Sequence, residues 1–196
     1  MNFKVFLLIF IGFLNSFQHV SAASCSSSDI SNINKCYYDY LTALRIDPSS
    51  TFEYYYQYVR NNYLLVSWNG VNQLCNTFGK LQFCVNKDCM NLGDFKKVAT
   101  YGGISANDFI GNYYAFEYMC SSEGNLRYKN SYECLKSNSE IIGKNCGSFG
   151  NDCFSRNIEN KCIVNYAKEY CGSEAYIYTN NSLSTILCHS RPECCY

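Results

Sequence analysis

Fourteen cysteines are the residues of this chain with the clearest chemistry, because thiols can pair as disulfides or hold a zinc ion. Four residues separate Cys84 from Cys89, which is within the loose range of metal-ligand spacing. An oxidising compartment would consume such thiols as disulfides, so we predict structural bridges and no metal site. The cysteines predicted to form disulfides are Cys25, Cys36, Cys75, Cys84, Cys89, Cys120, Cys134, Cys146, Cys153, Cys162, Cys171, Cys188, Cys194 and Cys195.

Few other residues suggest catalysis. His189, beside Cys188, is the only histidine beyond the first 22 residues. A catalytic histidine must be held by a buried carboxylate and face a nucleophile, so we interpret His189 as a surface residue and predict no catalytic site and no cofactor. An extracellular hydrolase using carboxylates is an alternative, and it would require Asp94 or Asp108 to face Glu117 in a cleft.

The first residues have the pattern of a secretory leader. Lys4 precedes an apolar run from Val5 to Leu14, and Val20-Ser21-Ala22 fits a signal peptidase site. We therefore predict a signal peptide over residues 1–22 and a disulfide-stapled helical domain over residues 23–196. The apolar run is much shorter than the roughly 20 residues of a membrane-spanning helix, so we expect a secreted, extracellular protein without a membrane anchor.

Charge and glycosylation signals constrain the partners. Acidic and basic residues number 16 each and neither forms a long run, which argues against nucleic acid as the main partner. Asn180 begins the sequon Asn180-Asn181-Ser182, and we expect it to be glycosylated. We therefore predict a secreted, disulfide-stabilised binding or interaction protein whose partner is an extracellular protein or glycan. The oligomeric state is open, with a monomer favoured.

The spacing of apolar residues predicts an all-α, mainly helical single domain of about six helices. Helices are expected near residues 30–44, 50–59, 71–85, 105–120, 131–142 and 158–170. Ser105, three residues before Asp108, is the predicted N-cap of the clearest of them. Gly172 is placed to end the last helix in a left-handed conformation, and Ala175 to Thr179 is the only strand candidate.

Two tyrosines on the second predicted helix could be either buried or part of a binding surface. Tyr54 and Tyr58 form a stripe on the second predicted helix, either as a second buried face or as an aromatic contact surface for a protein or glycan. A helical lipid-binding protein is another alternative, and it would require a continuous apolar cavity between helices.

The order of the first twelve cysteines resembles that of a nematode family of secreted proteins, the domain of unknown function nineteen. The most specific parts are the segment from Leu74 to Cys89 and the segment from Lys161 to Gly172, which resemble the family's two cysteine-bearing helices. The resemblance covers nearly the whole chain after the leader and implies a largely helical, secreted protein without an assigned reaction. Cys194 and Cys195 lie beyond the family's usual last cysteine.

Overall fold

The computed structural model describes residues 25–147, 150 and 152–195, so the predicted leader lies outside the described residues. Within these ranges every regular element is helical, and the chain is an all-α, disulfide-rich domain as predicted. The longer helices are α2 (Ser27–Ala43), α3 (Phe52–Val59), α4 (Trp68–Cys84), α6 (Ala106–Cys120), α7 (Ser122–Cys146) and α8 (Cys153–Ser190). The short elements are α5 (Leu92–Phe95), the π-helical turn η1 (Arg60–Leu64), and the 3-10 turns η2 (Lys87–Cys89), η3 (Gly103–Ser105) and η4 (Pro192–Cys194).

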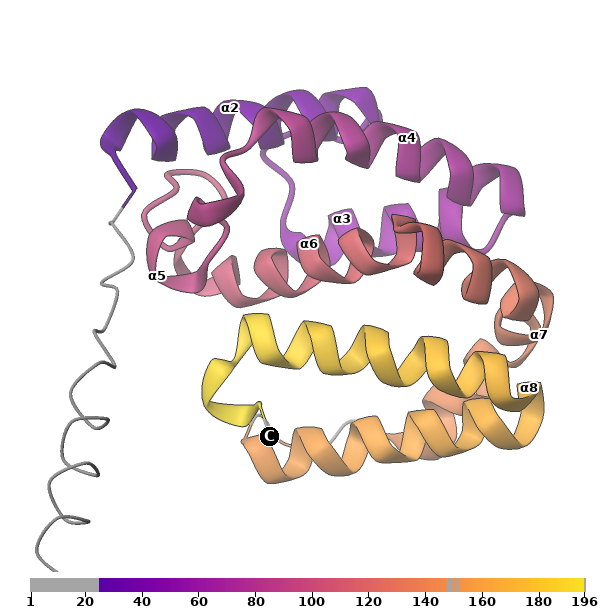
Figure 1. Cartoon of the computed structure of the whole chain (residues 1–196). Coiled ribbons are helices and arrows are strands. Elements are labelled where there is room, and N and C mark those ends of the chain that lie inside the picture. The colour runs from indigo at the N-terminus through magenta and orange to yellow at the C-terminus, as the bar shows by residue number, and fades with distance from the viewer. Residues whose placement is uncertain (1–24, 148–149, 151, 196) are drawn as a thin grey trace, which may run out of the picture.

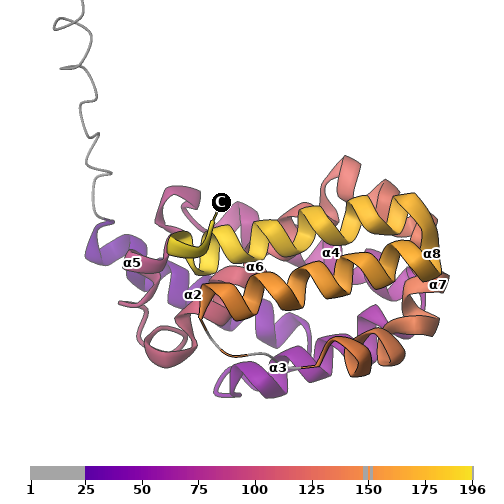
Figure 2. The same cartoon turned by 90° about the horizontal axis from the view of Figure 1, so that it is seen from below.

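The helices are arranged in layers around α6 (Figure 1). Helices α2 and α4 run antiparallel on one side of it, and α3 lies in the same layer as α6. On the other side, α8 folds back on itself as a hairpin whose second arm runs along α6, as the view from below also shows (Figure 2). Helix α6 is therefore central and is covered on two sides.

The main core lies where α6 meets the first four helices. Phe109 and Tyr113 of α6 are buried there, and their rings make edge-to-face contacts with Tyr37 of α2 and Phe78 of α4. Such contacts are favourable beyond the area that the rings bury. Many of the chain's tyrosines therefore serve packing rather than surface recognition.

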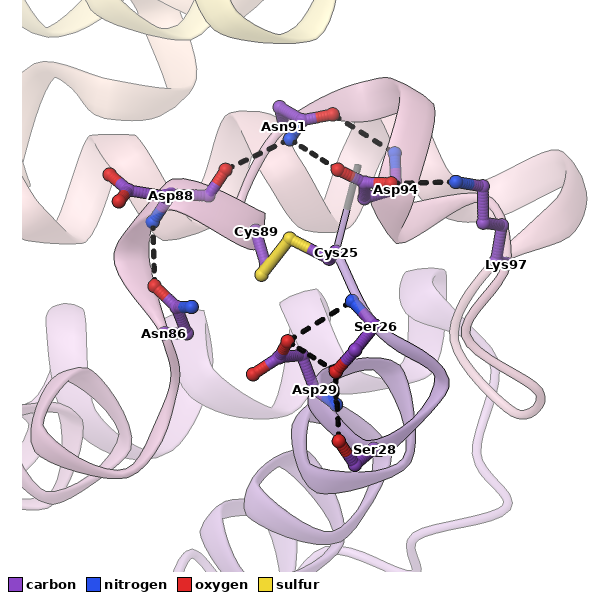
Figure 3. Close-up of a disulfide and its surroundings, with 10 residues drawn as sticks. All are labelled: Cys25, Ser26, Ser28, Asp29, Asn86, Asp88, Cys89, Asn91, Asp94 and Lys97. Atoms are coloured by element: carbon purple, nitrogen blue, oxygen red, sulfur yellow. Dashed lines mark hydrogen bonds and ion pairs between the residues drawn. A yellow bond between two sulfur atoms is a disulfide. The ribbon is translucent and has the colours of Figure 1, made fainter. Parts of the chain in front are cut away.

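Side-chain caps begin most of the helices. Ser26 caps α2, since its hydroxyl accepts a hydrogen bond from the backbone N–H of Asp29, whose carboxylate in turn accepts from the N–H of Ser26 (Figure 3). This capping box satisfies backbone donors that the first turn leaves unpaired. Similar caps begin the other long helices, at Thr51, Ser67, Ser121 and Asp152.

Helix α6 is the exception, and here the sequence prediction was partly wrong. The helix ends at Cys120 as expected, but Ser105 makes no side-chain cap. It is the last residue of η3 and has φ −87° and ψ 1°, whereas the capping Ser26 is extended with ψ 160°. A 3-10 turn that leads directly into the helix thus replaces the capping serine, because the serine is no longer in the extended conformation that capping requires.

The C-terminal half departs further from the predicted elements. Helix α7 extends well beyond residues 131–142 and ends before Gly147 instead of Gly143. Gly172 ends the first arm of α8 with φ +82° and ψ −169°, and the second arm begins directly after it. The strand candidate Ala175 to Thr179 was wrong, because it belongs to this second arm, where Ala175 and Tyr178 share one face of the helix.

All fourteen cysteines are paired in seven disulfides. The bonds are Cys25–Cys89, Cys36–Cys84, Cys75–Cys120, Cys134–Cys171, Cys146–Cys162, Cys153–Cys194 and Cys188–Cys195. Cys84 and Cys89 thus belong to two different disulfides, as the prediction of structural bridges requires. The two tail cysteines, Cys194 and Cys195, bond back to α8 within the chain. No bond joins residues 25–120 to residues 134–195, so the disulfides divide into two separate sets.

Candidate functional site

A pocket with a volume of about 540 Å³ lies between α3, α6 and the two arms of α8. Helix α6 contributes positions 108, 111, 112, 115 and 119, which recur at three- and four-residue steps and so lie on one face. This face borders the main core, since Met119 belongs to the core and Asn112 accepts a hydrogen bond from the hydroxyl of the buried Tyr55. From Asp108 to Met119 the helix rises about 16 Å, so the pocket is elongated.

The middle of the pocket is mainly apolar. Phe52 of α3, Phe116 of α6 and Ile163 and Leu183 of the two arms of α8 line it. Gly111 lets α6 approach the second arm of α8 closely, because a Cβ atom at this position would lie 3.1 Å from Cγ2 of Ile186. These helices therefore form both walls of one groove.

One end of the pocket is charged. Asp108, Glu53, Glu159, Arg156 and Arg191 all line it. A guanidinium nitrogen of Arg156 lies 3.0 Å from Oε2 of Glu159, so these two charges are paired. Partial burial raises the pKa of Asp108, the positive charges of Arg191 and Arg156 oppose this shift, and the negative charge of Glu53 adds to it.

The other end of the pocket is formed by tyrosines. The rings of Tyr128 and Tyr178, both pocket residues, stack at 4.6 Å between centroids, and Trp68 packs edge-on against Tyr128. Burial raises the pKa of both tyrosine hydroxyls well above the ordinary value, and the hydroxyl of Tyr56 is near each of them. Among the described residues, the buried side-chain polar atoms without a hydrogen-bond partner are instead the hydroxyls of Tyr101 and Tyr132.

The carboxylates named in the hydrolase alternative do not come together. Asp94 pairs with Lys97 at 2.7 Å, and Glu117 pairs with Lys87 at 2.5 Å. Asp108 and Glu117 are nine residues apart on α6 and so point to opposite sides of the helix. Asp108 instead shares the pocket with Glu53 and Glu159, two residues that we did not predict.

His189 is exposed at the end of α8. Its ring stacks face to face on Tyr114 with centroids 3.4 Å apart, and partial burial lowers its pKa. Glu117 and Lys87 are the charged groups near it. His189 is therefore a surface residue, as predicted, and its imidazole packs against the ring of Tyr114.

Two further predicted surface features can be located. Asn180 is exposed on the second arm of α8, in a helix, and borders a second hollow of about 320 Å³ that Asn157 and Asn165 also line. Tyr54 is 55% exposed, whereas Tyr58 is half-buried against the core. The tyrosine stripe is therefore divided between packing and surface.

The described part of the chain was found to have neither a metal-binding cluster nor a membrane-spanning helix. No cluster of three or more histidine, cysteine, aspartate or glutamate side chains there could hold a metal ion. None of the helices described combines the length and apolar character needed to cross a membrane.

Comparisons of the chain with protein-family models, curated proteins and solved structures found no match. The resemblance to the nematode family therefore stays a prediction.

Proposed function

We propose that this protein is secreted and binds an elongated, mainly apolar small molecule in the pocket between α3, α6 and α8. The observation that carries the proposal is the pocket itself, whose volume of about 540 Å³ falls in the range of small-molecule sites. Its apolar middle, with polar and charged side chains toward one end, could hold the apolar body of a ligand and fix its orientation. The apolar middle between helices supports the helical lipid-binding alternative, which calls for a continuous apolar cavity.

Disulfides support the proposal because they hold in place the helices that form the walls of the pocket. Cys75–Cys120 holds the end of α6 to α4, and Cys134–Cys171 holds the end of the first arm of α8 to α7. A binding site whose walls are held before the ligand arrives loses less conformational entropy on binding. Seven disulfides and a predicted leader also support an extracellular location, where such bonds persist.

A pocket-filling substitution tests the proposal. Ala115 lines the pocket on α6, so Ala115→Trp places an indole in the space that a ligand would occupy. Binding of the uncharged dye Nile red to the oxidised protein, followed by its fluorescence, should weaken by about tenfold or more. The matched control is Ala43→Trp, at the exposed last residue of α2 and outside the pocket, which should leave dye binding unchanged.

Circular dichroism must show the same helix content for both variants. The proposal would be wrong if the folded wild-type protein bound no Nile red. It would also be wrong if Ala115→Trp bound the dye as tightly as Ala43→Trp did.

An extracellular hydrolase is the second candidate, because one specific observation favours it. Asp108 has a raised pKa and shares a cleft with the carboxylates of Glu53 and Glu159, as a general acid and its partner would. Turnover of chromogenic glycosides or esters that Asp108→Asn abolishes would support this reading. Turnover that survives the substitution would exclude Asp108 as the acid.

A further inference from the structure

We propose that a groove between the two arms of α8 holds the first sugars of an N-linked glycan carried by Asn180. The groove is the second hollow, with a volume of about 320 Å³, and it is distinct from the pocket that α6 lines. This inference goes beyond the proposed function, because it needs the secretory route but no ligand in the pocket.

The groove runs along the α8 hairpin, whose two arms lie side by side in Figure 2. Its lining positions are 157, 160, 161, 164 and 165 on the first arm and 176, 180, 183, 184, 187 and 188 on the second. Steps of three and four residues place each set on one face of its arm, so two stripes form the walls. Cys194 and Cys195 lie at the end beside Cys188, and no described residue of α3, α6 or α7 lines the groove. From position 176 to position 188 the second arm rises about 18 Å, which is enough for several sugar rings.

The polar groups of the groove are mainly amides. Asn157, Asn160, Asn165 and Asn180 line it, and Lys161 is the one charged side chain among its described lining residues. Within the described part of the chain, no hydrogen bond joins any of these four amides to another residue. An amide both donates and accepts hydrogen bonds, and so does each hydroxyl of a sugar. The groove therefore suits a neutral, hydroxyl-rich ligand better than a charged one.

Apolar surface lies among the amides. Val164, Leu183 and Leu187 supply aliphatic side chains, and the ring of Tyr176 lies at the end opposite Cys188. Lys168, which does not line the groove, lies over this ring with its ammonium nitrogen 5.3 Å from the centroid. A sugar ring has a face of C–H groups that packs on aromatic and aliphatic side chains while its hydroxyls bond to amides. The groove thus offers both kinds of surface that a carbohydrate uses.

The sequon is a second, independent observation that points to a sugar. Asn180 begins the sequence Asn180-Asn181-Ser182, and its exposed side chain borders the groove. Asn181, by contrast, is turned toward α6, where its amide donates to the hydroxyl of Tyr118 at 3.1 Å. Tyr176 lies four residues before Asn180 and so on the same face of the helix. A glycan attached to Asn180 would therefore begin in the groove, one helical turn from this ring.

Attachment also explains why the occupant is the protein's own glycan and not a free sugar. A covalent tether keeps the local concentration of the sugar on the order of millimolar or above. Contacts too weak to hold a free oligosaccharide are then sufficient to keep the first sugars in the groove.

Thermal unfolding of the oxidised, full-length protein secreted from insect cells provides the test. Mass spectrometry should find a glycan on Asn180, and its removal with an N-glycanase should lower Tm by about 2–4 °C. In Tyr176→Ala the same removal should lower Tm by less than about 1 °C, because the ring that packs on the sugar is gone. Tyr54→Ala is the matched control, since Tyr54 is exposed on α3 outside the groove, and it should behave as the wild-type protein does. If Tyr176→Ala is not secreted, Asn165→Ala, which removes an exposed groove amide, replaces it.

A relocated glycan separates binding in the groove from any general effect of glycosylation. Lys129 is exposed on α7 and precedes Asn130 and Ser131, so Lys129→Asn creates the same Asn-Asn-Ser sequence away from the groove. This substitution is combined with Asn180→Gln, which keeps an amide but removes the original site. Removal of the relocated glycan should change Tm by less than about 1 °C.

Three results would overturn the inference: an unmodified Asn180 in the wild-type protein, a Tm loss that Tyr176→Ala leaves intact, or an equal loss from the relocated glycan. Nile red binding reports on the pocket between α3, α6 and α8, whereas these measurements report on the groove. Either proposal can therefore fail without the other.

Discussion

At the scale of single residues, two serines that look alike in the sequence have different roles. Ser26 and Ser105 both stand three residues before an aspartate, yet only Ser26 forms a capping box. We expect Ser26→Ala to lower the free energy of unfolding by about 1 kcal/mol, because backbone N–H groups of the first turn lose their acceptor. We expect Ser105→Ala to change it by less than about 0.5 kcal/mol, as for surface residues without a specific contact.

Urea unfolding of the two variants beside the wild-type protein, all oxidised, measures both values. Equal losses would contradict the structure, since they would mean that Ser105 caps α6 after all.

At the scale of elements, the α8 hairpin depends on one glycine. Gly172 has φ +82° and ψ −169°, a conformation that is essentially restricted to glycine. Gly172→Ala should therefore lower the unfolding free energy by about 1–3 kcal/mol, the usual cost of such strain. Gly143→Ala is the control, because Gly143 lies inside α7 with open space around it and alanine favours helix.

Thermal unfolding monitored by circular dichroism compares the two alanine variants. The interpretation would be wrong if Gly172→Ala were as stable as Gly143→Ala.

The elements also show what the sequence could predict. The apolar spacing in α2, α4 and α6 identified these helices, because one face of each enters the core. It could not predict the pocket, because the face of α6 that lies toward α8 carries Asp108, Gly111, Asn112 and Ala115 and so has no apolar periodicity to signal it. Nor could the apolar spacing predict that Glu53 and Asp108 lie at the same end of the pocket, because only tertiary packing brings α3 and α6 together there.

At the scale of the whole molecule, the disulfides should contribute unequally. Cys75–Cys120 joins residues 45 apart in the sequence and Cys188–Cys195 joins residues 7 apart. A cross-link restricts the unfolded chain more when it closes a longer loop, so replacing the first pair by alanine should cost about 4 kcal/mol and the second about 2 kcal/mol. Unfolding in urea without reductant measures both losses, and equal losses would show that loop length does not determine them.

The separation of the disulfides into two sets also bears on how the chain is made. In the secretory pathway that we propose, a chain enters the oxidising compartment with its N-terminus first. The six cysteines up to Cys120 have all their partners among themselves, so their three bonds can form before Cys134 arrives. The later eight then pair among themselves, and Cys194 and Cys195 come last. The order of synthesis thus limits competition between the halves, and only the two bonds of Cys194 and Cys195 must wait for the end of the chain.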